Sequence, residues 1–267
     1  MEILNVSAEC FPVAKVGGLA DVVGALPKYH KKLGQKSKVV MPFYDNSFTS
    51  GERFYSIYNN HLNLGNLHYD FEVLVPDKSL DFPVYLIKIP GLLDRPEVYS
   101  YEDDTERFLA FQIAVLDWVV SMEKKPSLIH THDHHTGFIP FLMSYGYKYK
   151  ELKEIPTVLT IHNAQYQGKF GYDKLRYFPD FDLEKMGMID WDGEINSLAT
   201  GIKCAWRVTT VSPNYLEELK DDAKGLQELI RNEKDKFSGI LNGIDTNVWN
   251  PATDELLTRN YSNKTDK

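Results

Sequence analysis

The chain has 267 residues, with 30 basic and 38 acidic side chains that give a formal net charge of −8. This length can bury a substantial core, as one large domain or as two small ones. The acidic balance and the lack of a basic tail argue against a general nucleic-acid binder, so an anionic ligand would need local positive potential. Cys10 and Cys204 are too few for a disulfide framework and are consistent with a reducing compartment.

The sequence carries no visible targeting or membrane-spanning segment. Residues 1–6 contain no basic n-region and no long apolar run, so no signal peptide is expected. No apolar stretch approaches the length of a transmembrane helix. We therefore expect a cytoplasmic protein that binds neither membranes nor nucleic acid.

Strands and helices alternate through most of the chain. Short apolar runs predict strands at residues 3–6, 38–42, 127–130, 156–161, 207–211 and 239–241. Helical spacing of apolar residues, or a helix-start signal, predicts helices at residues 18–33, 105–122, 136–147 and 197–206, and one from residue 213. Pro27 is expected to kink or split the first helix, and Gly34 to end it.

Two segments depart from this alternation. Residues 52–90 contain strand-like runs at 71–75 and 83–89 with no helix between them, which indicates a β-rich insertion or meander. Residues 249–267 are polar and indicate a tail or a truncated interdomain linker. We therefore predict one α/β domain over residues 1–248, built on a doubly wound, mostly parallel sheet.

In such sheets ligands bind at the carboxyl ends of the strands. Polar clusters follow four of the predicted strands, at the Lys15 turn, at 130–135, at 162–163 and at 242–243. Because the carboxyl ends of parallel strands meet at one edge of a sheet, these clusters should line one cleft. Gly17 and Gly18 would let the backbone approach a phosphorylated ligand, with Lys15 and the N–H groups of the next helix supplying positive potential.

Each cluster also has a simpler interpretation. The four histidines of residues 130–135 invite a metal site, but no well-spaced further ligand accompanies them, so we expect none. The 162–168 loop could merely satisfy its own backbone groups, and Lys15 could be a solvated loop lysine. A nicotinamide-dependent oxidoreductase is disfavoured, because the three-glycine fingerprint is missing after the first strand.

Taken together, these residues resemble the N-terminal domain of the bacterial glycogen synthase and plant starch synthase family, the ADP-glucose-dependent glucosyltransferases. The matching pieces run in family order over nearly the whole chain, and the first and last are the most specific: residues 15–22, 132–135, 162–163 with 166–168, 211–213, 239–245 and 249–251. His134 is a departure, because the family usually carries tryptophan after the aspartate.

The resemblance implies one half of a GT-B glycosyltransferase, in which two Rossmann-like domains face each other across a cleft. Such an enzyme transfers glucose from ADP-glucose to the 4-hydroxyl at the non-reducing end of an α-1,4-glucan and retains the anomeric configuration. It implies no metal and no cofactor, since ADP-glucose is the donor substrate. On the donor side, Lys15 would bind the phosphates, Gly17 and Gly18 would allow close approach, and Asn242 and Gly243 would complete the site.

The resemblance assigns the remaining positions as follows. Asp133 and His162 are the expected catalytic residues, in contact with the transferred glucose or its diphosphate. Asp21 and Asn163 belong to the acceptor side or to the structure of the turn. Further candidates for the acceptor path lie in the 91–104 loop: Arg95, Tyr99 and Tyr101.

The family continues into a second Rossmann-like domain, which nothing after Trp249 could supply. The chain is then an excised domain or a short natural relative, and a protein that supplies the missing half is a candidate partner. A non-catalytic glucan-binding or regulatory module that acts through a partner is the alternative. In either case we expect little glucose transfer by the chain alone.

Overall fold

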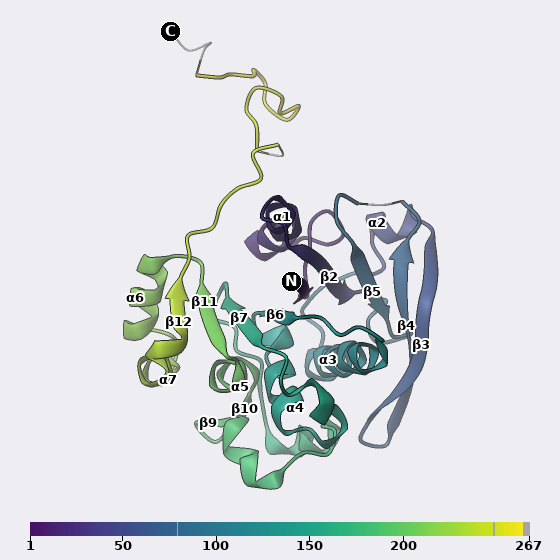
Figure 1. Ribbon diagram of the computed structural model, residues 1–267, viewed down its shortest axis with the longest axis vertical. Coiled ribbons are helices and arrows are strands. Elements are labelled where there is room, and N and C mark those ends of the chain that lie inside the picture. The colour runs from purple at the N-terminus through teal and green to yellow at the C-terminus, as the bar shows by residue number, and fades with distance from the viewer. Residues whose placement is uncertain (79, 248, 264–267) are drawn as a thin grey trace.

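The computed structural model describes residues 1–78, 80–247 and 249–263, which form a three-layer α/β domain and an irregular C-terminal segment that extends away from it (Figure 1). Its nine-stranded sheet has the order β12-β11-β7-β6-β1-β2-β5-β4-β3. The strands are β1 Glu2–Val6, β2 Lys36–Pro42, β3 Phe54–Leu64, β4 Leu67–Pro76, β5 Val84–Lys88, β6 Leu128–His132, β7 Thr157–Ile161, β11 Arg207–Thr210 and β12 Phe237–Gly239. The predicted domain boundary at residue 248, residue 79 and the last four residues of the predicted tail lie outside the described residues.

The helices and the minor elements complete the domain. The α-helices are α1 Gly18–Lys32, α2 Ser47–Ser50, α3 Asp104–Ser121, α4 Ile139–Tyr145, α5 Ser197–Cys204, α6 Pro213–Asp221 and α7 Gln227–Asn232. The 3-10 helices are η1 His134–Thr136, η2 Tyr147–Leu152, η3 Tyr172–Tyr177, η4 Leu183–Met188 and η5 Lys234–Lys236. A small antiparallel sheet consists of β8 Lys169–Phe170, β9 Asp190–Trp191 and β10 Glu194–Asn196. None of the helices in the described ranges is long and apolar enough to cross a membrane.

The sheet is mostly parallel, as predicted. All neighbours from β12 to β5 pair in parallel, whereas β4 is antiparallel to both β5 and β3. The β-rich stretch 52–90 therefore extends the main sheet, and its last strand, β5, is a parallel neighbour of β2. The chain moves from β1 to β2 in one direction and later returns to place β6 on the other side of β1. The connections leaving β1 and β6 diverge there, which makes this position the switch point where doubly wound sheets bind ligands.

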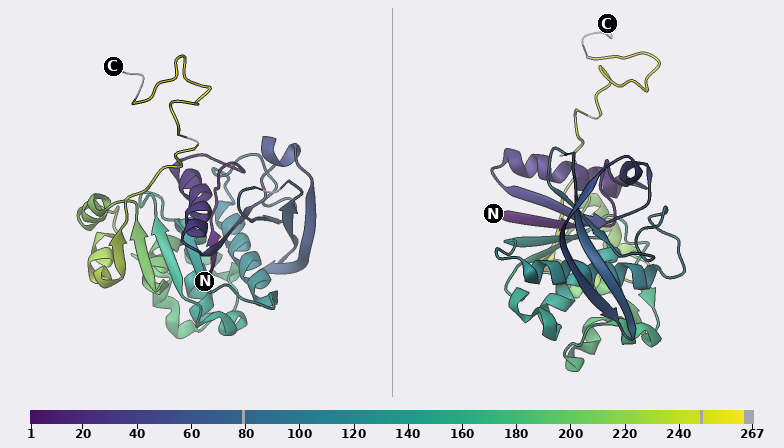
Figure 2. Two further views of the ribbon diagram at one scale, coloured as in Figure 1. Left: turned by 45° about the horizontal axis from the view of Figure 1, so that its top comes forward. Right: turned by 90° about the vertical axis from the view of Figure 1, so that its right-hand side faces the viewer.

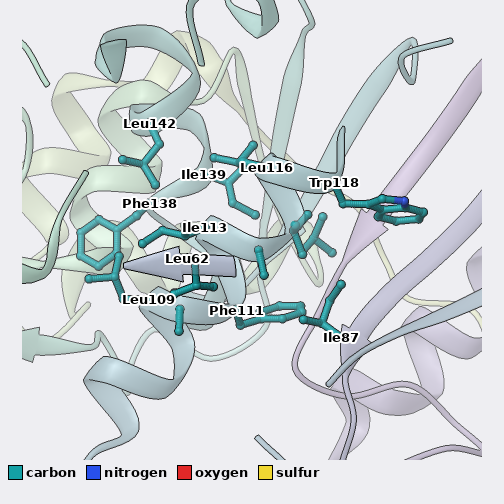
Figure 3. Packing of buried hydrophobic residues seen from close by; sticks show 14 of the residues in the cluster. Leu62, Ile87, Leu109, Phe111, Ile113, Leu116, Trp118, Phe138, Ile139 and Leu142 are labelled. Atoms are coloured by element: carbon teal, nitrogen blue, oxygen red, sulfur yellow. The ribbon is translucent and has the colours of Figure 1, made fainter. Parts of the chain in front are cut away.

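Helices cover both faces of the sheet (Figure 2). Alternate residues of β2 show this directly: Val39 and Met41 pack with Leu19 and Val23 of α1, whereas Val40 faces the opposite cluster. That opposite cluster gathers the apolar residues of α3 and α4 against the sheet (Figure 3). A strand covered on both faces has to be apolar at successive positions, which is why short continuous apolar runs located these strands.

The start of α6 and the end of α1 agree with the sequence signals, whereas Pro27 does not split α1. Ser212 caps α6 by accepting a hydrogen bond from the Tyr215 N–H at 2.9 Å, and Pro213 follows at the first helical position. Gly34, at φ +75°, follows α1 as the sequence indicates. Pro27 does not split α1, which runs unbroken from Gly18 to Lys32 with Pro27 buried inside it. One missing N–H is tolerated because the helix is held by packing of its buried face.

The connection between β6 and β7 is divided into three short helices, where the sequence predicted one helix over residues 136–147. It contains η1, the short helix α4 and then η2, and Gly137 lies where α5 approaches closely. A Cβ atom on Gly137 would be 2.3 Å from the Ser197 carbonyl oxygen. Only glycine fits between these two backbones.

We therefore expect Gly137→Ala to lower the free energy of unfolding by about 1–3 kcal/mol, the usual cost of overpacking. Gly187→Ala is the matched control, because a Cβ there would meet nothing within 4 Å. Its effect should stay within about 0.5 kcal/mol. Urea denaturation of the two variants measures the difference, and equal stabilities would show that the backbone contact is relieved cheaply.

Candidate active site

A cavity of about 800 Å³ opens at the carboxyl ends of the central strands, beside the switch point. All four clusters singled out in the sequence contribute to its wall. The predicted site residues that line it are Gly17, Gly18, Tyr99, Asp133, His162, Asn163 and Asn242. Within the described residues, the wall also contains the carboxyl groups of Glu9 and Asp104 but no lysine or arginine.

The other predicted site residues lie around this cavity. Lys15 extends to Asp21, and its Nζ is 2.8 Å from both carboxylate oxygens. Asp21 and Gly243 line a neighbouring cavity of about 240 Å³, which shares Gly18 and Asn242 with the larger one. The turn thus presents its cation already paired with a carboxylate, on a side chain that remains 39 % exposed.

Arg95 and Tyr101 do not line either cavity in the part of the chain described. Arg95 forms two hydrogen bonds to the Asp103 carboxylate, both 2.7 Å long, and its guanidinium lies 5.0 Å from the centre of the Tyr101 ring. Of the three candidates on the 91–104 loop, only Tyr99 reaches the cavity. Arg95 and Tyr101 instead stabilise the loop that carries it.

Arg107, in the first turns of α3, holds the same 91–104 loop. Its side chain is fully buried, lies 4.4 Å from the Tyr101 ring centre and forms an ion pair with Asp104. It also donates hydrogen bonds to three backbone carbonyl oxygens, those of Leu92, Glu97 and Val98. Three loop carbonyls thus depend on one guanidinium, whose planar fork of donors suits this arrangement.

Glu9 is the cavity residue that the sequence did not reveal. The buried carboxylate accepts hydrogen bonds from the N–H groups of Val16 and Gly17 at 2.5 and 2.9 Å, and from the Tyr99 hydroxyl at 2.7 Å. These two N–H groups are therefore occupied by the protein's own carboxylate. The N–H groups that stay without a partner inside the helix begin at Gly18, the first residue of α1.

Gly17 and Gly18 are not required by the fold of this chain. Neither has a positive φ, and a Cβ atom on either would meet nothing within 4 Å. Space without protein atoms beside a helix N-terminus is the arrangement that lets a ligand approach the backbone. The two glycines thus leave open the part of the wall where α1 begins.

Asp133 has the backbone geometry of a strained site residue, with φ +56° and a buried side chain. Its Oδ1 accepts hydrogen bonds from the N–H groups of His162 and Asn163 at 2.7 and 3.3 Å. Burial raises the pKa of Asp133 to about 7, against the lowering effect of these two hydrogen bonds, and the charge of Glu9 raises it further. A carboxyl group in a cavity that titrates near neutrality is typical of functional sites.

The histidines in and behind the cavity wall are buried or half-buried, and they are neutral at pH 7. Burial lowers the pKa of His162 to about 4, that of His130 to about 3, and that of His132 well below its ordinary value. The Nδ1 atom of His132 lies 3.1 Å from the Nε2 atom of His162, which joins the two rings through one hydrogen bond. In the ranges that the structure describes, no group of three or more His, Cys, Asp or Glu side chains is arranged to hold a metal ion.

His134, the residue that follows Asp133 in the sequence, is also part of the cavity wall. His134 lines the cavity, and a Cβ atom on Gly168 would approach its ring to 2.8 Å. The His134 ring lies 3.7 Å from that of His135, and the His135 ring stacks on Tyr99 at 4.6 Å between centroids. A continuous aromatic surface therefore connects residue 134 with the 91–104 loop.

The open parallel sheet, the helices on both faces and the cavity at the switch point define a Rossmann-like ligand-binding domain. The sequence profile of the family described as "Starch synthase catalytic domain" matches residues 2–232, and the chain belongs to this family. Its fold matches the corresponding part of a GT-B glycosyltransferase.

Individual relatives agree with this assignment. The chain is 54% identical to a glycogen synthase of Flavobacterium johnsoniae over 263 residues, and 38% identical to one of Streptococcus agalactiae serotype III over 269 residues. The solved catalytic domain of starch synthase IV from Arabidopsis thaliana, bound to ADP and acarbose, is 31% identical with a TM-score of 0.89. Each comparison covers 98% of this chain but 56% of the relative, so the chain spans about half the length of these relatives.

We expect Arg107→Met to lower the free energy of unfolding by about 3–5 kcal/mol, because it leaves three loop carbonyls without their donor and removes the ion pair of the partly buried Asp104 carboxylate. The exposed Arg231 on α7 provides the control, and Arg231→Met should change stability by no more than about 0.5 kcal/mol. Urea denaturation measures both. A loss below 1 kcal/mol for Arg107→Met would mean that the loop does not depend on this side chain.

Stability should fall as the pH is lowered from about 6.5 to 4. Five histidines with lowered pKa values gain protons on unfolding in this range, each contributing up to about 1.4 kcal/mol per pH unit; they are His130, His132, His134, His135 and His162. Asp133 has a raised pKa and loses a proton on unfolding, so it acts in the opposite direction.

Two substitutions separate these contributions. His135→Phe should make the fall in stability shallower, and Asp133→Asn should make it steeper, whereas His61→Phe at an exposed position should leave it unchanged. Denaturation midpoints measured at several pH values check the slopes. A pH dependence that does not respond to His135→Phe would contradict the assignment of a neutral, buried imidazole.

Proposed function

We propose that this chain is the acceptor-side, N-terminal Rossmann-like domain of a retaining glucosyltransferase of glycogen or starch synthesis, and that it acts in the cytoplasm. The domain would comprise residues 1–248, with 249–267 as the start of an interdomain linker. The complete enzyme would transfer glucose from ADP-glucose to the non-reducing end of an α-1,4-glucan, without a cofactor. Membership of the starch synthase catalytic domain family and 54% identity to a glycogen synthase support this.

One observation carries the proposal: polar groups from four separate strand ends line a single cavity at the switch point. In this proposal Asp133 and His162 contact the transferred glucose, because carboxyl and imidazole groups form directional hydrogen bonds with hydroxyls. Asn163 would act beside them or on the acceptor side, together with Tyr99. A cavity of about 800 Å³ is within the range of ligand pockets.

The donor's diphosphate would lie next to the beginning of α1. Gly17 and Gly18 leave space for it there, and the first N–H groups of α1 have no partner within the helix. Asn242 and Gly243 line the adjoining wall. Lys15 would leave Asp21 and pair with a phosphate, which an exposed side chain on a loop can do at small cost. The leaving ADP gains negative charge as its bond to glucose breaks, so preorganised cations and N–H groups accelerate the step.

The charge of the cavity supports the view that this chain forms only half of the site. Its described wall carries the carboxyl groups of Glu9, Asp104 and Asp133 and no lysine or arginine. Arg107 compensates the Asp104 carboxyl, but those of Glu9 and Asp133 have no basic side chain in the described wall, so a nucleotide diphosphate bound against them needs further positive charge. A second domain, or a partner protein that supplies the missing half, would provide it. The alternative is a glucan-binding or regulatory module that never binds the donor.

We expect the purified chain to show negligible ADP-glucose-dependent elongation of glycogen, measured by incorporation of labelled glucose. It should still bind ADP-glucose weakly in ligand-observed NMR, and Lys15→Ala should weaken binding about tenfold or more, the loss of one charge-assisted hydrogen bond. Lys31→Ala, at an exposed position in the last turn of α1, is the control and should bind normally.

The alternatives give different results. Retardation in glycogen-containing gels without any binding of ADP-glucose would favour the glucan-binding module. Rapid glucose transfer by the chain alone would contradict the half-site proposal. Equal losses in Lys15→Ala and Lys31→Ala would show that the contribution of Lys15 is only a general effect of charge.

A further inference from the structure

The hydrogen bond between His132 and His162 connects a buried strand residue to the wall of the cavity. His132 ends β6 and is fully buried, whereas His162 follows β7 and lines the cavity. The two rings lie 5.3 Å apart between centroids, and Nδ1 of His132 is 3.1 Å from Nε2 of His162. The His132 ring does not line the cavity, and the hydrogen bond to His162 connects it to the cavity wall.

Two neutral imidazoles can share this hydrogen bond in only two ways. Either His132 carries its proton on Nδ1 and donates, or His162 carries its proton on Nε2 and donates. Burial lowers the pKa of both groups, so the doubly protonated forms do not contribute near pH 7. The choice determines whether His162 presents an N–H donor or a lone pair at its second nitrogen, Nδ1.

The second nitrogen of His132 favours the first arrangement. Its Nε2 atom is buried and has no hydrogen-bond partner within the described residues. In the first arrangement this atom is a bare lone pair, whereas in the second it is a buried N–H without an acceptor. Orphaned buried N–H groups are the rarer of the two defects in folded proteins, by analogy with the backbone.

With Nε2 of His162 bonded to His132, the free polar atom of the His162 ring is Nδ1. In the first arrangement this atom is an N–H donor, and in the second it is a lone pair.

We propose that His132 is a positioning residue: its Nδ1–H donates to Nε2 of His162 and thereby holds the proton of His162 on Nδ1. The buried strand end thus determines that the cavity offers a hydrogen-bond donor at this position. The use of that donor on a sugar or phosphate oxygen rests on the proposed function. The tautomer itself does not, because it is set within the chain before any ligand binds.

Long-range 1H–15N spectra of the histidine-labelled chain at pH 7.5 test the tautomer directly. We expect a protonated Nδ1 and a non-protonated Nε2 for His162, with His162→Gln identifying its signals. The reverse pattern would overturn the proposal. This measurement uses the wild-type chain without ligand, so a failure to bind ADP-glucose would count against the proposed function and leave the tautomer result standing.

Substitutions at His132 then separate positioning from packing. His132→Phe keeps a ring in place but removes the donor, and it should shift His162 toward protonation at Nε2, the form that free histidine favours. His132→Asn places an amide N–H near the position of Nδ1–H and should restore protonation at Nδ1. A purely structural role predicts that both variants affect His162 alike, which would contradict the proposal.

The control is His135→Phe, which changes another buried histidine of the wall that has no hydrogen bond to His162 among the described contacts. It should leave the His162 spectrum in the wild-type form. A change in the His162 tautomer as large as that caused by His132→Phe would mean that general repacking, and not the hydrogen bond, sets the proton position.

Discussion

The buried carboxylate of Glu9 holds the two sides of the cavity together. It binds the N–H groups of Val16 and Gly17 on one side and the Tyr99 hydroxyl, ninety residues further along the chain, on the other. An ionised group with few hydrogen bonds would be costly to bury, and these three donors offset the cost. The turn before α1 and the 91–104 loop therefore keep a fixed relative position. Lys15 and the first N–H groups of α1 are presented outward from that fixed turn.

Much of the fold could be predicted because it depends on local patterns. Buried parallel strands such as β7 have to be apolar at successive positions, so their sequences identify them. β3 lies within the predicted β-rich stretch 52–90 but was not identified as a strand, because it is an edge strand whose residues are mostly exposed and mix polar with apolar side chains. Pro27 does not split α1, because the cost of one lost hydrogen bond is local, whereas the packing that holds α1 together involves its whole buried face.

The candidate site was predictable where topology alone determines it. The strand-end rule brought Gly17, Asp133, His162 and Asn242 to one wall without any knowledge of their contacts. Glu9 could not be found in this way, because a single glutamate in a loop has no pattern and its partners are distant in sequence. Arg107 and the His132–His162 hydrogen bond are similar cases, since their importance lies in burial and geometry.

The electrostatics of the wall explain why such a site would be divided between two bodies. Within the described chain the cavity combines neutral imidazoles with the carboxyl groups of Glu9, Asp133 and Asp104, of which Asp104 is paired with Arg107, and this surface suits hydroxyls better than a diphosphate. Lys15, the adjacent cation, is already paired with Asp21. In the function proposed above, with the compensating cations on the opposing half, the donor's phosphates would be held strongly only when the two halves meet. Closure would then also exclude water from the reacting bond, so that tight donor binding and protection from hydrolysis follow from the same movement.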